Sequence, residues 1–310
     1  MITVQEKVVL APLTSFRIGG EAQYLVDVRS VEELKEAILF AREKNIPFYM
    51  LAGGTNVLIS DKGISGLVIR IKIGETSCEG EILEAYAGTP LIKVINVAAE
   101  YGLSGLESMA GVPGTFGGAV RGNAGAYGTE VGNFVDSVSA LDSETLEMRE
   151  FSMQESDFSY RSSYFKKNPK YIVVSAKLKL MVSTKQECQA KVKEIIMNRT
   201  GKGLQGVRSA GSFFMNPKLE EGSPLLEEFA KDKGVPARNN VVPAGWVIDR
   251  MGLRGKTIGG AAVSKEHANY VVNLGDAKAE DVVMLVSYIK QQIRDEMGIQ
   301  MQEEVNYVGF

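Results

Sequence analysis

Two glycine-rich segments of this sequence could bind an anionic ligand. Residues 53–56 (GGTN) directly follow an apolar run, and residues 111–118 read GVPGTFGG. Glycine allows positive φ angles and a close approach of the backbone to a ligand, so each segment could direct N–H groups at a phosphate. Thr115 and Asn123 are candidate side-chain partners. Each segment could instead be an ordinary turn, but the two together favour a clamp for a diphosphate.

A third glycine pattern carries less weight. Residues 201–206 formally match Gly-x-Gly-x-x-Gly. They follow a predicted helix rather than a strand, however, and lack the surrounding dinucleotide-binding unit. No Gly-x4-Gly-Lys-Ser/Thr motif occurs, so a P-loop is excluded.

Metal and thiol chemistry are poorly supported. Cys78 and Cys188 stand far apart, and His267 is the single histidine. Neither a disulfide framework nor a zinc or other metal site is therefore predicted. Redox chemistry would need an organic cofactor.

Composition narrows the class of protein. The chain has 310 residues, of which 45% are hydrophobic and 24% charged, enough for two or three compact units. No apolar run approaches the roughly 20 residues that span a bilayer, and residues 1–16 resemble no secretion signal, so we expect no membrane insertion and a cytoplasmic location. A net charge of −3 with dispersed Lys and Arg argues against nucleic-acid binding. No obligate protein partner is evident.

The elements around the first glycine-rich segment predict a βαβ unit. Residues 22–28 (AQYLVDV) predict a strand, and Ser30 with Glu33 forms a capping-box pattern that opens a helix. Pro47 ends the helical pattern, and the run PFYMLAGG predicts the next strand. The glycines would then lie at the carboxyl end of a strand, where open α/β sheets bind ligands.

The second glycine-rich segment lies in a long loop. A strand at 82–87 leads through Thr89, as N-cap, and Pro90, as first helical residue, into a helix that Gly102 ends. Residues 102–132 lose regular periodicity but retain apolar side chains that can be buried. They therefore predict an ordered loop rather than disorder.

The rest of the chain predicts further regular elements. A hairpin turns at 142–143, a strand follows at 171–180, and a helix begins at Ser183, with Gln186 completing a capping box, and runs to about Arg199. An amphipathic helix near the C-terminus ends at a Gly298 C-cap, before a final strand.

Taken in order, these segments resemble the motifs of the UDP-N-acetylenolpyruvoylglucosamine reductases, flavoenzymes of peptidoglycan precursor synthesis. The resemblance covers nearly the whole chain. The matching motifs are FRIGG at 16–20, GGTN at 53–56, GVPGT at 111–115, NAGAY at 123–127, YRSSYFK at 160–166, GSFF at 211–214 and EV at 304–305.

The resemblance implies an α+β fold and a flavin cofactor. A two-part FAD-binding domain of the vanillyl-alcohol-oxidase type would occupy 1–199, with subdomains at about 1–75 and 76–199, and an α/β substrate-binding domain would occupy 200–310. FAD would bind non-covalently, and NADPH would supply hydride to reduce the enolpyruvyl group of UDP-N-acetylenolpyruvoylglucosamine to UDP-N-acetylmuramate. The implied cofactor-binding residues are Ala52, Gly53, Gly54, Thr55, Asn56, Gly111, Val112, Pro113, Gly114, Thr115, Gly117, Gly118, Asn123 and Gly125.

Three residues are implied to be catalytic. Hydride addition to the enolpyruvyl double bond leaves an enolate, which must be stabilised and then protonated. By resemblance Ser212 supplies the proton, while Arg161 and Glu304 flank the substrate carboxylate and stabilise the enol form. An Arg guanidinium can donate two parallel hydrogen bonds to a carboxylate, which Lys cannot reproduce. Whether the serine is activated by its surroundings or the enolate is basic enough to take its proton stays open.

Read singly, each of these three residues could be an ordinary surface group. Their arrangement in the family order favours the catalytic interpretation.

Other positions are assigned by the same resemblance. Lys202 and Asn216 match positions that contact the UDP-sugar, where a cation near the diphosphate is favourable. The tyrosine-bearing insertion that covers substrate in the longer subclass is absent, so the chain resembles the shorter subclass, although residues 218–244 are longer than in compact members. His267 is interpreted as structural, because the mechanism needs no imidazole, and Trp246 as part of the core.

Two alternatives belong to other functional classes. A flavin-dependent alcohol or lactone oxidase would share the cofactor fold but pass electrons to oxygen, and it would lack the cluster of Arg161, Ser212 and Glu304. A non-catalytic nucleotide-sugar-binding protein would bind a UDP-sugar without flavin. Flavin content separates the second alternative from both enzymes.

Overall fold

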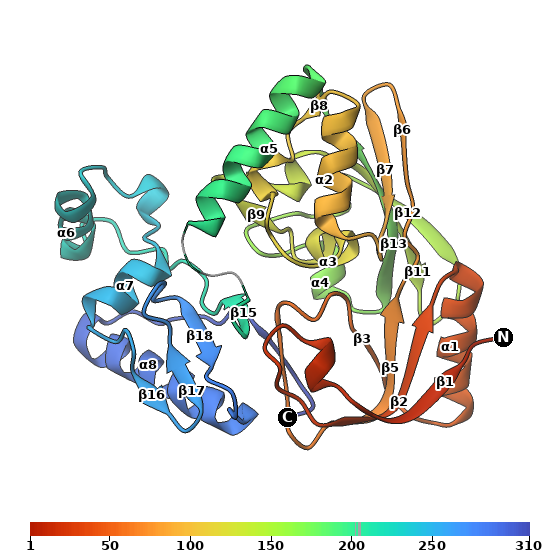
Figure 1. The fold of residues 1–310 in the computed structure, drawn as a ribbon, viewed down its shortest axis with the longest axis horizontal. Coiled ribbons are helices and arrows are strands. Elements are labelled where there is room, and N and C mark those ends of the chain that lie inside the picture. The colour runs from red at the N-terminus through yellow and green to blue at the C-terminus, as the bar shows by residue number, and fades with distance from the viewer. Residues whose placement is uncertain (202, 204–205) are drawn as a thin grey trace. The chain divides into compact units, whose positions relative to one another are not determined.

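The protein divides into two compact units. The structure, a computed structural model, describes residues 1–201, 203 and 206–310. Unit 1 comprises Met1–Val8, Ala22–Gly54 and Ile64–Gly201, and unit 2 comprises Val9–Glu21, Thr55–Gly63 and the described residues after Gly201. Two short segments from within the range 1–199 are therefore grouped with the C-terminal part. Both units contain helices and strands, which confirms the α+β prediction (Figure 1).

A partly parallel sheet forms the first half of unit 1, with the strand order β1-β2-β5-β3 (Figure 1). Both β2 and β3 run parallel to β5, which is inserted between them. The predicted βαβ unit therefore forms around a third strand. The elements are β1 (Val4–Val9), β2 (Glu21–Val28), α1 (Val31–Glu43), β3 (Phe48–Met50) and β5 (Ile64–Ile71).

The N-terminus of α1 is capped as the sequence predicts. The Ser30 hydroxyl accepts a hydrogen bond from the Glu33 amide at 3.1 Å. The Glu33 carboxylate accepts from the amide of Arg29, at 2.6 Å. The second bond of the capping box is thus displaced by one residue.

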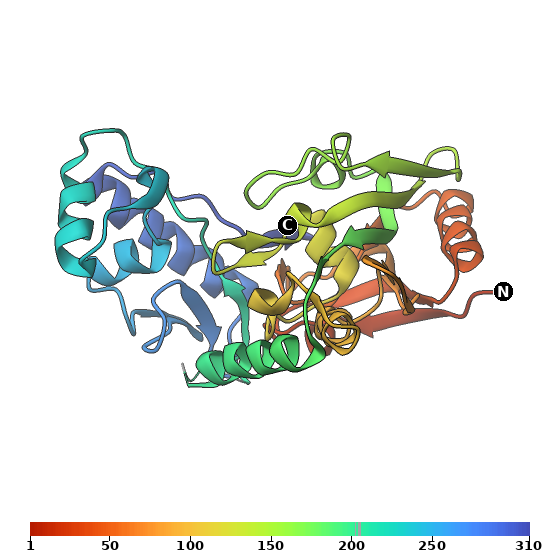
Figure 2. The same ribbon diagram turned by 90° about the horizontal axis from the view of Figure 1, so that it is seen from above.

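An antiparallel sheet forms the second half of unit 1, with the order β12-β11-β13-β7-β6. Strands β7 and β13 confirm the two strands predicted here, and α2 and α5 lie side by side (Figures 1 and 2). The elements are β6 (Thr76–Glu79), β7 (Ile82–Tyr86), α2 (Leu91–Glu100), β11 (Val135–Asp142), β12 (Met148–Ser152), α4 (Tyr164–Lys167), β13 (Tyr171–Lys179) and α5 (Lys185–Thr200).

Two predicted helix starts are wrong by one residue. Helix α2 begins at Leu91, with Pro90 as N-cap at ψ 132°, because Leu91 donates its amide to the carbonyl of Gly114. Thr89 therefore makes no cap and donates its hydroxyl to the Glu75 carbonyl. Helix α5 is capped by Thr184 with Glu187, instead of Ser183 with Gln186, because the carboxylate of Glu187 accepts from the Thr184 hydroxyl at 2.8 Å.

The loop at 102–132 is structured, as predicted, but it contains short elements that the sequence did not predict. Its buried side chains join the core of the antiparallel half of unit 1. The short elements of this region are β8 (Leu103–Ser104), which pairs with β14 (Met181–Val182), η2 (Glu107–Met109), α3 (Phe116–Arg121), β9 (Gly125–Ala126), β10 (Thr129–Glu130) and η3 (Val131–Asn133).

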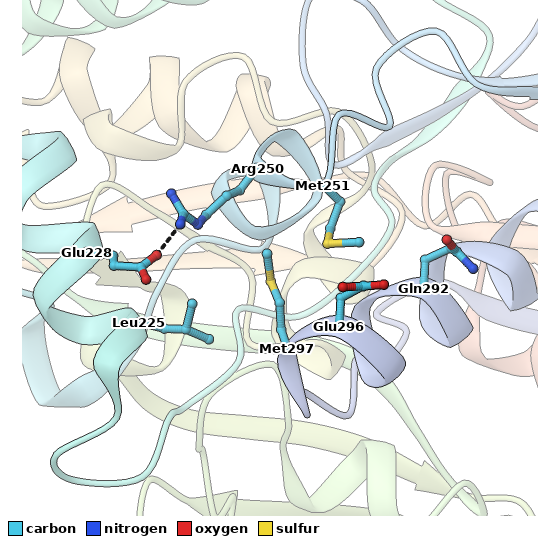
Figure 3. Close-up of a pocket in the computed structure, with 7 residues that line it drawn as sticks. All are labelled: Leu225, Glu228, Arg250, Met251, Gln292, Glu296 and Met297. Carbon is cyan, nitrogen blue, oxygen red and sulfur yellow. Dashed lines mark ion pairs between the residues drawn. The ribbon is translucent and has the colours of Figure 1, made fainter.

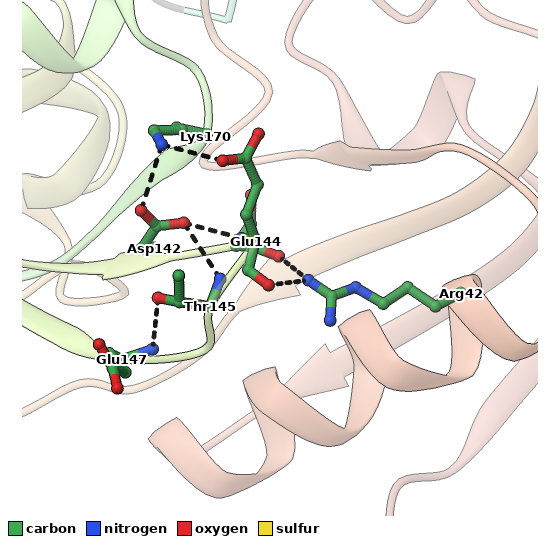
Figure 4. Close-up of polar contacts among 7 residues, drawn as sticks. Arg42, Asp142, Glu144, Thr145, Glu147 and Lys170 are labelled. Atoms are coloured by element: carbon green, nitrogen blue, oxygen red, sulfur yellow. Dashed lines mark hydrogen bonds and ion pairs between the residues drawn. The ribbon is translucent and has the colours of Figure 1, made fainter.

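The two halves of unit 1 share a hydrophobic cluster and a polar contact. Leu34 and Ile38 of α1 belong to the same buried cluster as Leu141 of β11. Beside this cluster the Arg42 guanidinium donates to the backbone carbonyls of Ser143 and Glu144, the latter at 2.6 Å (Figure 4). The β11–β12 turn is thereby fastened to α1.

Unit 2 is built on a small antiparallel sheet with the order β15-β18-β17-β16. The predicted amphipathic helix is α8, which ends at Gly298 in a left-handed C-cap (φ 69°), as expected. The elements are η1 (Ala11–Leu13), β4 (Val57–Ile59), β15 (Ser209–Ser212), α6 (Pro224–Lys233), η4 (Arg238–Asn240), α7 (Ala244–Arg250), β16 (Thr257–Ile258), β17 (Ala261–Val263), β18 (Tyr270–Asn273), α8 (Ala279–Met297) and β19 (Asn306–Val308). Strand β19, the predicted final strand, runs parallel to β4.

No helix within the described residues is both long enough and apolar enough to cross a membrane.

Candidate functional site

The two glycine-rich segments meet backbone to backbone in unit 1. A Cβ atom on Gly53 would lie 2.8 Å from the Cα of Gly114 and 3.3 Å from the amide nitrogen of Thr115. Real side chains do not approach a backbone atom this closely, so only glycine fits at position 53. The loop after β3 and the loop before α3 are therefore brought together by the absence of a side chain.

Four amides at this meeting point are available to a ligand. Within the described part of the chain, the N–H groups of Ala52, Gly53, Gly114 and Thr115 donate to no protein acceptor. None of these four residues is buried. Backbone amides without a protein acceptor on glycine-rich loops bind phosphate oxygens, so the residues present fit the diphosphate of FAD.

Other predicted residues of the second segment support the loop. The amide of Gly117 donates to the Ala87 carbonyl at 2.9 Å, and a Cβ at Gly117 would lie 2.5 Å from the Cβ of Ala87. The amide of Gly118 donates to the hydroxyl of Thr115, which is the N-cap of α3. These glycines allow α3 to pack closely on the end of β7. Val112 packs on the core beneath the loop.

Arg199 lies beside the second segment, and sequence reasoning identified it only as a helix end. A Cβ on Gly111 (φ 81°) would lie 3.0 Å from the Cδ of Arg199. The described residues offer its guanidinium no hydrogen bond or ion pair. This cation therefore lies beside the first residue of the second glycine-rich segment. No sequence motif marks it.

Arg161 lies in a tight turn of unit 1 with an unusual backbone. Ser159 and Ser162 exchange two backbone hydrogen bonds across the turn, at 3.0 and 2.9 Å. Arg161 itself has φ 55°, a left-handed value that is uncommon outside glycine. Its carbonyl accepts from Lys166 at 2.8 Å, and its guanidinium carbon lies 5.8 Å from the ring centre of Tyr160. Strained residues of this kind cluster at functional sites.

Asn123 and Gly125 follow α3, and both serve contacts within the protein. Asn123 is 2% exposed, and its side chain bonds only to protein groups. At Gly125 a Cβ would lie 2.5 Å from the carbonyl oxygen of Thr129, so this glycine permits the close β9–β10 hairpin.

Unit 2 brings the backbones of two predicted catalytic residues together. The amide of Glu304 donates to the carbonyl of Phe213, which directly follows Ser212, at 2.8 Å. Ser212 ends β15 after Gly211, whose φ is 79°. The Ser212 hydroxyl is half-buried and makes no hydrogen bond within the residues that the structure describes, so it is available to donate a proton.

Asn56 lies beside Glu304 in the same unit. Its side-chain amide donates to the Glu304 carbonyl at 3.2 Å, and its own carbonyl accepts from the amide of Asn306. Tyr307 follows on β19, and burial raises the pKa of its phenol. The segment that carries Glu304 is therefore fixed on both sides.

The remaining predicted positions are placed as follows. Asn216 is exposed, and its side-chain oxygen accepts from the Ala244 amide at 2.9 Å. Lys202 lies outside the described residues. The Nδ1 atom of His267 accepts from the Asn269 amide at 3.3 Å, in agreement with a structural role. Trp246 is 8% exposed, packs edge-on against Phe229, and is confirmed as a core residue.

Unit 2 also contains a pocket of about 580 Å³. It is lined by side chains of α6, α7 and α8, including the ion pair of Glu228 with Arg250 and the thioethers of Met251 and Met297 (Figure 3). None of the residues predicted to bind or to react lines it. No group of His, Cys, Asp and Glu among the described side chains could hold a metal ion.

Comparison with known families supports this division of roles. A family model described as an FAD binding domain matches residues 22–145. A second, described as the C-terminal domain of UDP-N-acetylenolpyruvoylglucosamine reductase, matches residues 202–308.

Individual relatives match over nearly the full length. The chain is 34% identical over 308 residues to the UDP-N-acetylenolpyruvoylglucosamine reductase of Solibacter usitatus, covering 99% of this chain and 97% of the relative. It is 36% identical over 302 residues to that of Syntrophus aciditrophicus, covering 96% and 89%. Among solved structures, the UDP-N-acetylenolpyruvylglucosamine reductase of Thermus caldophilus matches with a TM-score of 0.77 and 32% identity, covering 99% of this chain and 100% of that chain.

Proposed function

Because the chain belongs to the UDP-N-acetylenolpyruvoylglucosamine reductase family, we propose that it reduces UDP-N-acetylenolpyruvoylglucosamine to UDP-N-acetylmuramate with NADPH. This reaction belongs to peptidoglycan precursor synthesis. The chain is a flavin-dependent oxidoreductase. The observation that carries the proposal is the Ser212 hydroxyl, which has no partner in the described chain and precedes the residue that pairs with Glu304.

Unit 1 binds FAD in this proposal. The amides of Ala52, Gly53, Gly114 and Thr115 would hold the diphosphate, because they are unpaired and lie on two loops in contact. The chemistry that bound FAD supplies is hydride transfer, from NADPH to the enolpyruvyl double bond. The residues after 200, with Asn216 and Lys202, would bind the UDP-sugar.

Protein side chains would stabilise the negative charge of the enolate and supply the proton that completes the reduction. Hydride addition to one carbon of the enolpyruvyl double bond would leave an enolate whose charge extends onto the conjugated carboxylate, and Arg161 and Glu304 would stabilise its enol form. The planar Arg161 guanidinium can donate two parallel hydrogen bonds to a carboxylate. Ser212 would donate its hydroxyl proton to the carbon adjacent to the one that accepts the hydride, which completes the reduction.

An anaerobic stopped-flow experiment tests the proposal. NADPH is mixed with the FAD-loaded protein to bleach the flavin absorbance, and UDP-N-acetylenolpyruvoylglucosamine is then added. We expect bleaching and then rapid recovery of absorbance with this substrate alone. Recovery only on admission of oxygen would favour the oxidase alternative, and a protein that retains no flavin after incubation with FAD and gel filtration would overturn both.

A further inference from the structure

The side chain of Asn123 uses its hydrogen-bonding groups on the protein itself. Its Nδ2 donates to the Glu130 carboxylate at 2.8 Å and to the Ser159 carbonyl at 3.0 Å, and its Oδ1 accepts from the Gly132 amide at 2.9 Å. An asparagine side chain has two N–H donors, so none is left for a cofactor. The backbone at Asn123 is left-handed (φ 44°), a conformation that asparagine tolerates better than most residues.

One of these partners belongs to the turn that carries Arg161. Ser159 and Ser162 close this turn by their two mutual backbone hydrogen bonds. The bond from Asn123 to the Ser159 carbonyl therefore fixes the start of the turn, two residues before Arg161.

Two further contacts hold the flanks of the turn to the same segment. Before it, the Phe158 ring lies on Gly132, where a Cβ would be only 2.7 Å from the ring carbon Cγ. After it, the Ser163 hydroxyl donates to the Arg121 carbonyl at 2.7 Å. The turn is thus attached on both sides to residues 121–132, which begin at the last residue of α3.

We propose that Asn123 is a positioning residue for Arg161: its buried side chain holds the turn 159–162 in the conformation that presents the guanidinium to the substrate. This inference rests on the proposed function, because it assumes that Arg161 contacts the substrate carboxylate. Asn123 acts through the backbone of the turn and touches no reacting atom. The backbone geometry of the turn includes the left-handed Arg161, which needs surrounding contacts to persist.

The substitution Asn123→Gly tests the proposal because glycine accepts the positive φ angle and removes only the side chain. A matched control is Asn45→Gly, since Asn45 also has φ 52° but is exposed, and its side chain makes no hydrogen bond among the described residues. In stopped flow, we expect Asn123→Gly to slow flavin reoxidation by substrate about 10- to 100-fold, as for a misplaced catalytic group. Flavin reduction by NADPH and the Kd for FAD should stay within about threefold of the parent values. Asn45→Gly should change none of these quantities.

A double-mutant cycle with Arg161→Lys separates positioning from general destabilisation. If Asn123 acts through Arg161, the substitution Asn123→Gly should slow reoxidation much less in the Arg161→Lys background than in the parent. Hydrogen exchange should also show faster exchange of the Ser159 and Ser162 amides in Asn123→Gly. Additive rate losses, or unchanged reoxidation in Asn123→Gly while Arg161→Lys is slow, would overturn the inference. Unchanged reoxidation in Arg161→Lys would instead remove Arg161 from the proposed function.

A milder variant covers the case in which Asn123→Gly does not fold. Ser163→Ala removes the bond to the Arg121 carbonyl on the other side of the turn. We expect it to slow reoxidation about three- to tenfold with an unchanged Kd for FAD. If Asn123→Gly is unfolded and Ser163→Ala reoxidises at the parent rate, the turn does not depend on these contacts and the inference is wrong.

Discussion

The two compact units offer different kinds of group to their proposed ligands. Unit 1 offers backbone amides on two loops that can touch only because Gly53 has no side chain. Unit 2 offers the side chains of Ser212 and Glu304, on segments joined by a backbone hydrogen bond. Flavin binding by unit 1 should therefore be sensitive to added atoms, whereas the chemistry of unit 2 should be sensitive to removed ones.

The largest effect is expected from removing the hydroxyl in unit 2. Ser212→Ala should slow flavin reoxidation by substrate about 10²–10⁴-fold, the usual loss for a general acid. Flavin reduction by NADPH and FAD affinity should not change, because the four unpaired amides proposed to hold the FAD diphosphate belong to unit 1. The two half-reactions are measured separately by anaerobic stopped flow. A parent-like reoxidation rate would remove Ser212 from the mechanism.

Arg161→Lys should have the next largest effect. Arg161 lies in unit 1 but is proposed to act through its side chain. Its replacement therefore tests whether an effect on reoxidation depends on the unit that carries the group or on the group being a side chain. Replacing a planar fork by a point charge should slow reoxidation about 10- to 100-fold, equivalent to one charged hydrogen bond of about 1.5–3 kcal/mol. We expect the Kd for FAD to be unchanged. A weaker Kd with a normal reoxidation rate would assign Arg161 to the cofactor instead.

Gly53→Ala tests the effect of an added atom in unit 1. The new methyl would meet the Gly114 backbone at 2.8 Å, and overpacking of this kind costs about 1–3 kcal/mol. The Kd for FAD should therefore rise about 5- to 150-fold, as measured by titrating the apoprotein and following flavin fluorescence. Gly74→Ala is the control, since a Cβ there would meet nothing closer than 3.6 Å. An equal effect of both substitutions would show that the contact between the loops does not matter.

The sequence predicts the regular elements better than the contacts between them. Periodicity and caps identified α1, β7, β13 and α8, because these elements depend on local patterns of apolar and capping residues. Helix starts at Thr89 and Ser183 were missed by one residue, since tertiary bonds to the Gly114 carbonyl and a competing Glu187 carboxylate decide them.

The candidate site was predictable only as a set of residue types. The position of the Gly53–Gly54 pair after a strand indicated a ligand loop, and the structure shows its close contact with Gly114. The bond from Asn123 to the Ser159 carbonyl was not predictable, because it joins residues 36 positions apart in the chain.

The smallest effect is expected at the contact between the two halves of unit 1, which carry Gly53 and Gly114. Asp142 accepts from the amides of Glu144 and Thr145 and pairs with Lys170 in the turn that Arg42 holds (Figure 4). The hydrogen bond from the Glu144 amide, with smaller contributions from Thr145 and Lys170, keeps the pKa of this carboxyl below its usual value against the opposing effect of burial.

This lowered pKa fixes the direction of the pH dependence. Asp142 has an unfolded pKa of about 3.9 and a lower folded one, so its stabilising effect is complete above about pH 4 and is lost as the pH falls through the folded pKa. Asp142→Asn should lower the Tm by about 1–3 °C at pH 7, and the difference from the parent should shrink on acidification below pH 4. Asp136→Asn, an exposed position on the same strand, should show no such difference at either pH. If the Tm difference for Asp142 persists unchanged at pH 3, the carboxylate charge does not stabilise the turn. If it shrinks as expected but the Kd for FAD at pH 7 is unaltered, the contact between α1 and the β11–β12 turn does not influence the two glycine-rich loops.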